Sequence, residues 1–91
     1  HPGEVLRGDF LPEYGLTAGR LAKAMGLKDR TRIERIVREL QPVTADTALR
    51  LGKVFGTSAE FWTNMQMTHD LSIAAIAARE QLAQLHQLEP A

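Results

Sequence analysis

Residues 17–38, TAGRLAKAMGLKDRTRIERIVR, decide the fold of this chain. They contain two segments with helical periodicity, joined by a turn at Gly26, and the second segment is rich in arginine. In the first segment, Leu21, Ala22 and Met25 share one helix face. Two helices that cross steeply need a small residue such as Ala22, and Gly26 can take the left-handed backbone that ends a helix. The pattern predicts a helix-turn-helix unit.

The second segment is predicted to run from Asp29, its N-cap, to about Leu40. Its apolar residues recur at i, i+3, i+4 and i+7, which predicts a buried stripe of Ile33, Ile36, Val37 and Leu40. The second helix of a helix-turn-helix unit can enter the major groove of DNA, which is ~12 Å wide. The alternative is an αα-hairpin in an ordinary bundle, whose charged side chains face water.

Charge is distributed unevenly along this chain of 91 residues, although its formal net charge is zero. Residues 17–38 carry seven Lys or Arg against two acidic residues, a local charge of +5. Residues 57–91 carry one Arg against four acidic residues, a local charge of −3. Such a chain can present one face to phosphates and another to a different partner. Its length predicts a single small domain with one core.

The remaining sequence predicts further helices and no strand. A first helix is expected from Pro2 to near Pro12. Thr44 is expected to cap a fourth helix that ends at Gly56, and Thr57 or Ser58 to cap a fifth. The residues expected on the buried side of the fourth helix are Ala48, Leu49, Leu51, Gly52 and Phe55. Those expected in the core from the fifth helix are Phe61 and Trp62. The predicted fold is all-α.

The C-terminal part has a different repeat. Leu71, Ala75, Ala78, Leu82 and Leu85 follow a 4-3-4-3 spacing, which is the a/d pattern of a coiled-coil seam. One interpretation is a dimer contact, and the other is a helix that packs on its own domain. We therefore predict a helix-turn-helix domain over residues 1–68 and a C-terminal helical extension, a candidate for dimerisation, over residues 69–91.

Enzymatic and membrane functions lack support in the sequence. The chain has no cysteine, and its histidines at positions 1, 69 and 86 lack metal-ligand spacing. It has no glycine-rich phosphate loop, so we predict no enzyme activity, metal or cofactor.

The longest apolar run, residues 73–78, is far shorter than the ~20 residues of a membrane span. The first residues lack signal-peptide character, although a start at His1 suggests that the native beginning is missing. The expected location is the cytoplasm.

Several motifs resemble HigA/VapI-type antitoxins of the Xre helix-turn-helix group. They are His1-Pro2-Gly3-Glu4-Val5-Leu6, Leu21-Ala22 with Gly26, Thr44-x-Asp46-Thr47-Ala48-Leu49-Arg50-Leu51, and Phe55-Gly56-Thr57-Ser58-x-Glu60-Phe61-Trp62-x-Asn64-Met65-Gln66. The resemblance implies a five-helix, lambda-repressor-like domain with an extended C-terminal helix. It also implies a homodimer, operator DNA as one partner and a cognate small toxin, typically a RelE-like ribonuclease that cleaves translated mRNA, as the other. Such an antitoxin neutralises its toxin and represses its own operon.

The resemblance also implies which residues contact DNA. With Ile33 as the anchor, Arg30, Thr31 and Arg35 reach base edges, and Arg32 is shared between bases and backbone. The positions implied for phosphate contacts are Thr17 and Ala18 at a helix start, with Lys28 and Arg38 as backbone clamps. A solvated surface role is the alternative for each arginine taken singly.

The chain departs from the family pattern at two places. One extra residue lies between Gly26 and Ile33, and Arg38-Glu39 stands where an Asn-Gly pair often closes the recognition helix. These differences leave the register on DNA open by about one residue. Two functions remain beside the antitoxin, namely a stand-alone Xre-type repressor and a helical interaction module without DNA binding.

Overall fold

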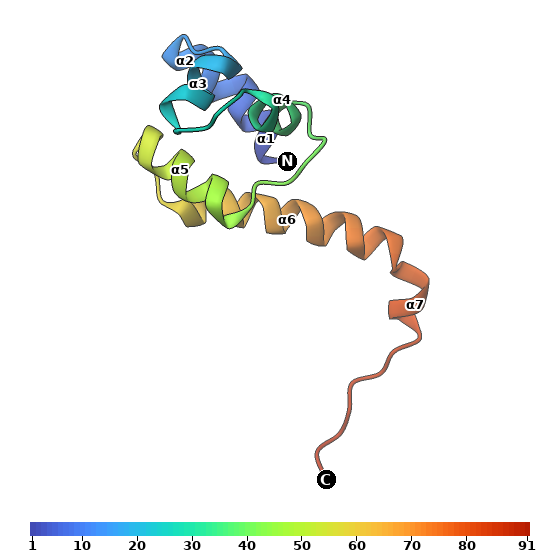
Figure 1. Cartoon of the computed structure of the whole chain (residues 1–91). Helices are drawn as coiled ribbons and strands as arrows, with labels where there is room; N and C mark the ends of the chain where they lie inside the picture. Colours follow the sequence, from blue (N-terminus) through green and yellow to red (C-terminus); the bar gives the residue numbers. More distant parts are fainter.

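A computed structural model describes all residues, 1–91, and contains helices but no strand. Its elements are α1 (Pro2–Val5), η1 (Leu6–Phe10), α2 (Leu11–Tyr14), α3 (Ala18–Ala24), α4 (Thr31–Val37), α5 (Ala45–Phe55), α6 (Ala59–Ala77) and α7 (Arg79–Ala83). Figure 1 shows α1 to α5 gathered into a globular part, from which α6 and α7 extend as an arm. The all-α fold class predicted from the sequence is confirmed.

The first helix is longer than predicted. Elements α1, η1 and α2 follow one another without a break as far as Gly15, which ends them with a left-handed backbone of φ 60°. The observed end at Tyr14 lies two residues beyond the predicted end near Pro12. Proline normally breaks a helix because it lacks an N–H and its ring meets a preceding carbonyl. Here the helix widens to a π turn over η1, in which Leu11 N–H donates to Leu6 O, and this turn accommodates Pro12.

The helix-turn-helix unit is formed by α3 and α4. The predicted face of α3 is buried, since Leu21, Ala22 and Met25 are at most 4% exposed. Gly26 has a φ of 74° and ends α3, as the sequence predicts. Beyond the turn, Ile33 and Ile36 are fully buried under α4. The apolar stripe of α4 therefore packs into the domain, and its opposite side is left at the surface.

The end of α4 departs from the prediction. The helix ends at Val37, and Leu40, predicted to continue the buried stripe, is 63% exposed. The reason lies at Glu39, which takes a left-handed backbone with φ 59° and redirects the chain. Glu39 N–H donates to Ile36 O and Leu40 N–H to Arg35 O, which closes the helix without glycine.

Helices α5 and α6 pack against each other and are both capped as predicted. Thr44 Oγ1 accepts a hydrogen bond from Thr47 N–H, Ser58 Oγ accepts one from Phe61 N–H, and Gly56 ends α5 with φ 72°. Leu49, predicted on the buried side of α5, is 65% exposed. Apart from Thr47, the buried positions on α5 follow i, i+3, i+4 and i+7 from Ala48, and Leu49 does not belong to that series.

Trp62 lies at the centre of the core and is fully buried. Its Nε1–H donates to Thr57 Oγ1 at 2.8 Å, so the buried indole has a polar partner. Phe10 and Phe55 stand beside it, with ring centroids 5.0 and 6.2 Å from the indole. The predicted core position is confirmed for Trp62, whereas Phe61 is 40% exposed and lies at the edge of the core.

The arm gives the molecule its elongated shape. Its extents are 55 × 25 × 23 Å and its radius of gyration is 16.7 Å, against about 12 Å expected for a compact domain of this length. Helix α6 runs from the globular part through residues 68 and 69, and the chain bends at Ala78 before α7 (Figure 1). Most apolar side chains of the arm, including Leu71, Ile76 and Leu82, are exposed.

Candidate nucleic-acid interface

The predicted interface residues lie on the outer side of α3, the following turn and α4. Thr17 is the N-cap of α3, where its Oγ1 accepts a hydrogen bond from Arg20 N–H at 3.2 Å. Ala18 is the first residue of α3 and is half-buried. The remaining predicted residues occupy the turn and α4. Arg32 is half-buried, and the others are exposed, namely Lys28, Arg30, Thr31, Arg35 and Arg38.

The turn before α4 is fixed by Asp29. Its Oδ1 accepts a hydrogen bond from Thr31 N–H at 2.8 Å, so Asp29 stabilises the start of α4, although Arg30 is the residue at the N-cap position. The hydrogen bonds from Thr31 lower the pKa of Asp29 below its usual value, which keeps the carboxylate ionised. This contact holds the first turn of α4.

The cations of α4 differ in how they are engaged. Arg30 Nε forms an ion pair with Glu34 Oε1 at 2.6 Å across one turn of the helix. This pair is exposed to solvent, and such pairs contribute little to stability. Arg35 and Arg38 are exposed and form no ion pair within the protein. Their guanidinium groups are available to an acceptor outside the molecule.

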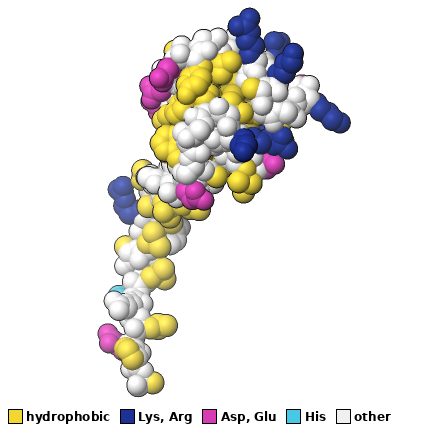
Figure 2. All heavy atoms as spheres, turned by 90° about the vertical axis from the view of Figure 1, so that its left-hand side faces the viewer, with side chains coloured by type: hydrophobic (Ala, Val, Ile, Leu, Met, Phe, Trp, Pro, Cys, Tyr) yellow, Lys and Arg dark blue, Asp and Glu magenta, His cyan; other side chains and the backbone are white.

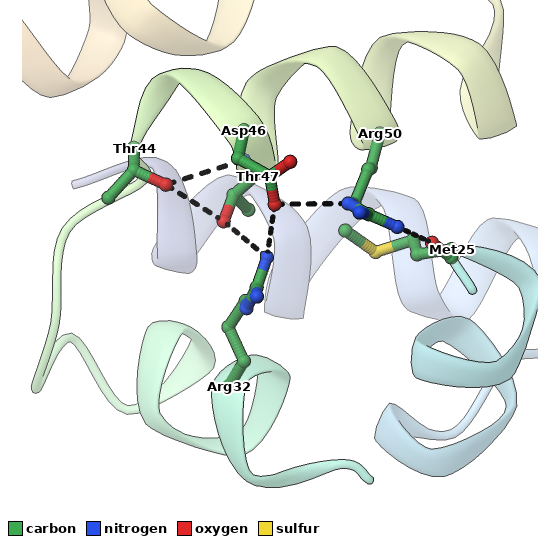
Figure 3. A network of polar contacts seen from close by, with 6 residues as sticks. All are labelled: Met25, Arg32, Thr44, Asp46, Thr47 and Arg50. Atoms are coloured by element: carbon green, nitrogen blue, oxygen red, sulfur yellow. Dashed lines mark hydrogen bonds and ion pairs between the residues drawn. The ribbon is translucent and has the colours of Figure 1, made fainter. Parts of the chain in front are cut away.

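Arg32 belongs to a polar network between α4 and α5 (Figure 3). Its Nη1 donates to Asp46 Oδ2 at 2.7 Å and lies 3.5 Å from Thr47 Oγ1. The same Asp46 oxygen accepts from Arg50 Nε at 3.0 Å, and Arg50 Nη1 donates to Met25 O at 2.8 Å. Because Met25 is the C-cap of α3, the network links the helix-turn-helix turn, the start of α4 and the first turns of α5.

The two arginines determine the charge state of Asp46. Their hydrogen bonds, from Arg32 first and Arg50 second, lower the pKa of Asp46 below its usual value. The carboxylate is thus ionised and is shared between two guanidinium groups. The network contains one more cation than anion, so it remains attractive to a phosphate or to another acceptor.

The sequence prediction did not include Asp46 and Arg50 among the interface residues. The i, i+4 spacing of Asp46 and Arg50 on one helix was a readable signal for their pairing. The contact of Asp46 with Arg32 had no local signal, because it joins residues from two different helices. Figure 2 shows that Lys and Arg side chains gather on the globular part of the molecule.

No group of three or more His, Asp or Glu side chains is placed to hold a metal ion. None of the helices has both the length and the apolar composition required to cross a membrane. The predicted C-terminal seam does not run along one continuous helix. Leu71 and Ala75 lie on α6, Ala78 lies at the bend where α6 ends, Leu82 lies on α7, and Leu85 lies beyond its end, so the bend interrupts the predicted 4-3-4-3 spacing.

Comparison with known proteins places this geometry among helix-turn-helix proteins. No family model matches the chain. It is 51% identical to virulence-associated protein I of Dichelobacter nodosus over 74 residues, which cover 81% of this chain and 68% of that protein. It is 36% identical to antitoxin HigA-1 of Vibrio cholerae over 69 residues, which cover 76% of this chain and 64% of that protein.

The solved structure of the Pseudomonas aeruginosa antitoxin HigA with the higBA promoter superposes on this fold with a TM-score of 0.91. The two sequences are 39% identical, and the superposition covers 98% of this chain and 97% of the other. The likeness therefore extends over the globular part and the arm, at an identity well above the level at which only the fold is shared.

Proposed function

Because the chain belongs to the HigA family of helix-turn-helix antitoxins, we propose that it binds operator DNA through α4 and represses its own operon. The observation that carries the proposal is the exposed cationic side of α4, whose opposite side is buried through Ile33 and Ile36. A relative of nearly the same length and fold has been solved with its promoter, which supports the same mode of binding.

In the proposed complex, the first turns of α4 enter the major groove. Arg30, Thr31 and Arg35 contact base edges, and the arginine fork can donate two hydrogen bonds to guanine O6 and N7. Arg35 is unpaired in the free protein, whereas Arg30 first leaves its exposed pair with Glu34. Thr17 and Ala18 at the start of α3, with Lys28 and Arg38, contact phosphates and fix the register on the duplex.

We further propose that the protein binds DNA as a homodimer through its C-terminal extension, residues 69–91. Leu71, Leu82 and Leu85 are all more than half exposed, as a surface that is covered only in a dimer would be. Two copies related by a two-fold axis can place two recognition helices about one DNA turn, ~34 Å, apart. Sedimentation or light scattering on a Leu71→Glu/Leu82→Glu variant tests this, since the variant is expected to be a monomer while the parent chain is a dimer.

The second proposed partner is a small toxin of the RelE-like ribonuclease class, which the antitoxin neutralises. The acidic side chains of the first helix, Glu4, Asp9 and Glu13, are exposed and would suit a basic nuclease. Figure 2 shows hydrophobic side chains gathered on one face of the globular part, and an apolar face of this kind also suits a protein partner. Replacement of the three acids by lysine is expected to abolish capture of the product of the adjacent gene. Retained capture would exclude this surface.

The DNA-binding proposal is tested by the salt dependence of affinity for a duplex from the promoter of its own operon. If Lys28 and Arg38 of both subunits neutralise four phosphates, affinity falls roughly 150-fold between 50 and 200 mM salt, at a slope of about −0.9 per phosphate. A scrambled duplex of the same composition is the control and should bind more weakly at every salt concentration. Negligible binding to both duplexes at 50 mM salt would favour an interaction module without a DNA role. A stand-alone repressor, by contrast, would bind DNA but capture no toxin.

A further inference from the structure

Arg32 is the one cationic residue of α4 whose guanidinium forms an ion pair with a residue of another helix. Its Nη1 donates a hydrogen bond to Asp46 Oδ2 on α5. Figure 3 shows the Arg32 side chain extending from α4 toward the start of α5. The Nε and Nη2 atoms of Arg32 form no hydrogen bond within the protein. These two nitrogens form a parallel pair of donors on the opposite edge of the fork. The free edge is thus suited to an acceptor with two oxygen or nitrogen atoms side by side.

The group that holds Arg32 is itself anchored. Asp46 shares its Oδ2 with Arg50 Nε, and Arg50 is fixed to the backbone of α3 by its bond to Met25 O. The hydroxyl of Thr47, which is 1% exposed, lies 3.5 Å from Arg32 Nη1 on the inner side of the network. Arg32 therefore faces outward from a scaffold made of three helices, rather than moving freely on α4.

We propose that Asp46 is a positioning residue that gives the protein part of its selectivity for operator DNA, by presenting the Nε/Nη2 edge of Arg32 to one base edge in the groove. This inference rests on the proposed DNA-binding function. On the operator, the guanidinium meets its acceptor while it remains paired with Asp46, so little side-chain freedom is lost on binding. On other sequences, Arg32 reaches a phosphate only by leaving Asp46. Asp46 thereby favours the operator and disfavours random DNA.

The test compares the ratio of affinities for operator and scrambled duplexes in four proteins. They are the parent chain, Asp46→Asn, Arg32→Ala and the double variant. Immobilising one long side chain on binding weakens affinity by about 2- to 12-fold, so Asp46→Asn is expected to lower the ratio by a factor in this range for each subunit that contacts a half-site. Affinity for the scrambled duplex should become more dependent on salt by about 0.9 in slope for each subunit bound, because the freed Arg32 of that subunit neutralises one further phosphate.

The double variant separates a positioning role from a merely structural one. If Asp46 acts through Arg32, then Asp46→Asn leaves the ratio unchanged once Arg32 is alanine. Asp9→Asn serves as the control for loss of one negative charge, since Asp9 is exposed on η1 and forms no ion pair. The thermal midpoint of every variant is measured, so that a change in the ratio is compared only among folded proteins.

Two results would overturn the inference. One is an unchanged ratio in Asp46→Asn, including the case in which affinity for both duplexes falls equally, because Arg32 would then be a sequence-independent phosphate contact. The other is an equal fall in the ratio whether or not Arg32 is present. If the parent chain itself does not prefer its own promoter, the proposed function fails. If the parent chain prefers the promoter and Asp46→Asn has the same ratio of affinities, then only the proposed role of Asp46 is refuted, and the proposed function stands.

Discussion

The contact between the first helix and α4 is so close at Gly3 that a single methyl group should disrupt it. An ideal Cβ built on Gly3 would lie 1.8 Å from the carbonyl oxygen of Ile36 and 2.8 Å from its carbonyl carbon. Real Cβ atoms essentially never approach closer than 3.0 Å, so α1 and α4 must separate by more than 1 Å. The obstructing atoms are backbone of the helix proposed to read DNA, and no rotamer change relieves the clash.

The expected loss of stability can be compared with the effect of the same substitution at Gly8, a second glycine of the first helix. Overpacking of a core contact typically destabilises a protein by about 1–3 kcal/mol, which is the cost expected for Gly3→Ala. A Cβ on the exposed Gly8 would meet nothing within 4 Å, and alanine in a helix is about 0.5–1 kcal/mol more favourable than glycine. Gly8→Ala should therefore stabilise the fold, although both variants make the same chemical change.

The assay is thermal or urea unfolding of both variants, followed by circular dichroism. For a domain of this size, a change of 1 kcal/mol shifts the thermal midpoint by roughly 4–8 °C, so the two midpoints should move in opposite directions by a measurable amount. A Gly3→Ala protein as stable as Gly8→Ala would refute the reasoning, because the first helix would then not be seated against Ile36.

Two further predictions concern the end of α4 and the ionised aspartates. Glu39→Gly should stabilise the fold by about 0.5–1 kcal/mol, because it removes left-handed strain of about 1–2 kcal/mol and loses only the exposed pair with Arg7. Glu39→Ala, which keeps the strain, should not stabilise it, and equal midpoints for the two variants would contradict this explanation. Asp29 and Asp46 have folded-state pKa values below the unfolded value of 3.8, so their stabilisation is complete above pH 3.8 and is lost as pH falls below it. The midpoints of the parent chain and Asp46→Asn should accordingly differ at neutral pH and converge well below pH 3.8, whereas a constant difference would exclude the ion pairs as its source.

Local features of the fold could be predicted because their causes are local. Gly26 ends α3 with the backbone that the turn requires, and Thr44 caps α5 through a side chain three residues from its partner. Trp62 was assigned to the core from its helical spacing and is fully buried. In each case, neighbouring residues along the chain determine the conformation.

The errors arose where a pattern was extended past a change in the backbone. Leu40 continues the apolar spacing of α4, but the left-handed turn at Glu39 carries it into solvent. Pro12 is typical of a helix end, but in the structure a π turn precedes it and the helix continues to Tyr14. Neither Glu39 nor the π turn has a strong sequence signal, because both depend on tertiary packing.

The candidate interface was predictable in outline but not in its connections. The run of cations from Lys28 to Arg38 marked the surface, since helical periodicity separates it from the buried stripe. The sequence could not show which arginine forms an ion pair within the protein and which remains unpaired. That distinction depends on α5 lying beside the start of α4, so that Asp46 meets Arg32 while Arg35 stays unpaired.

The most direct test of the central claim, that the outer side of α4 reads paired bases, is the effect of Arg35→Ala on binding to operator and random duplexes. Lys53→Ala is the control, because it removes an equal charge from an exposed position of α5 that lies outside the predicted interface and outside residues 69–91. Arg35→Ala is expected to weaken operator binding by about 1–3 kcal/mol per half-site more than random binding, as loss of a bidentate base contact does. Equal losses on both duplexes, or losses no greater than those of Lys53→Ala, would contradict the claim.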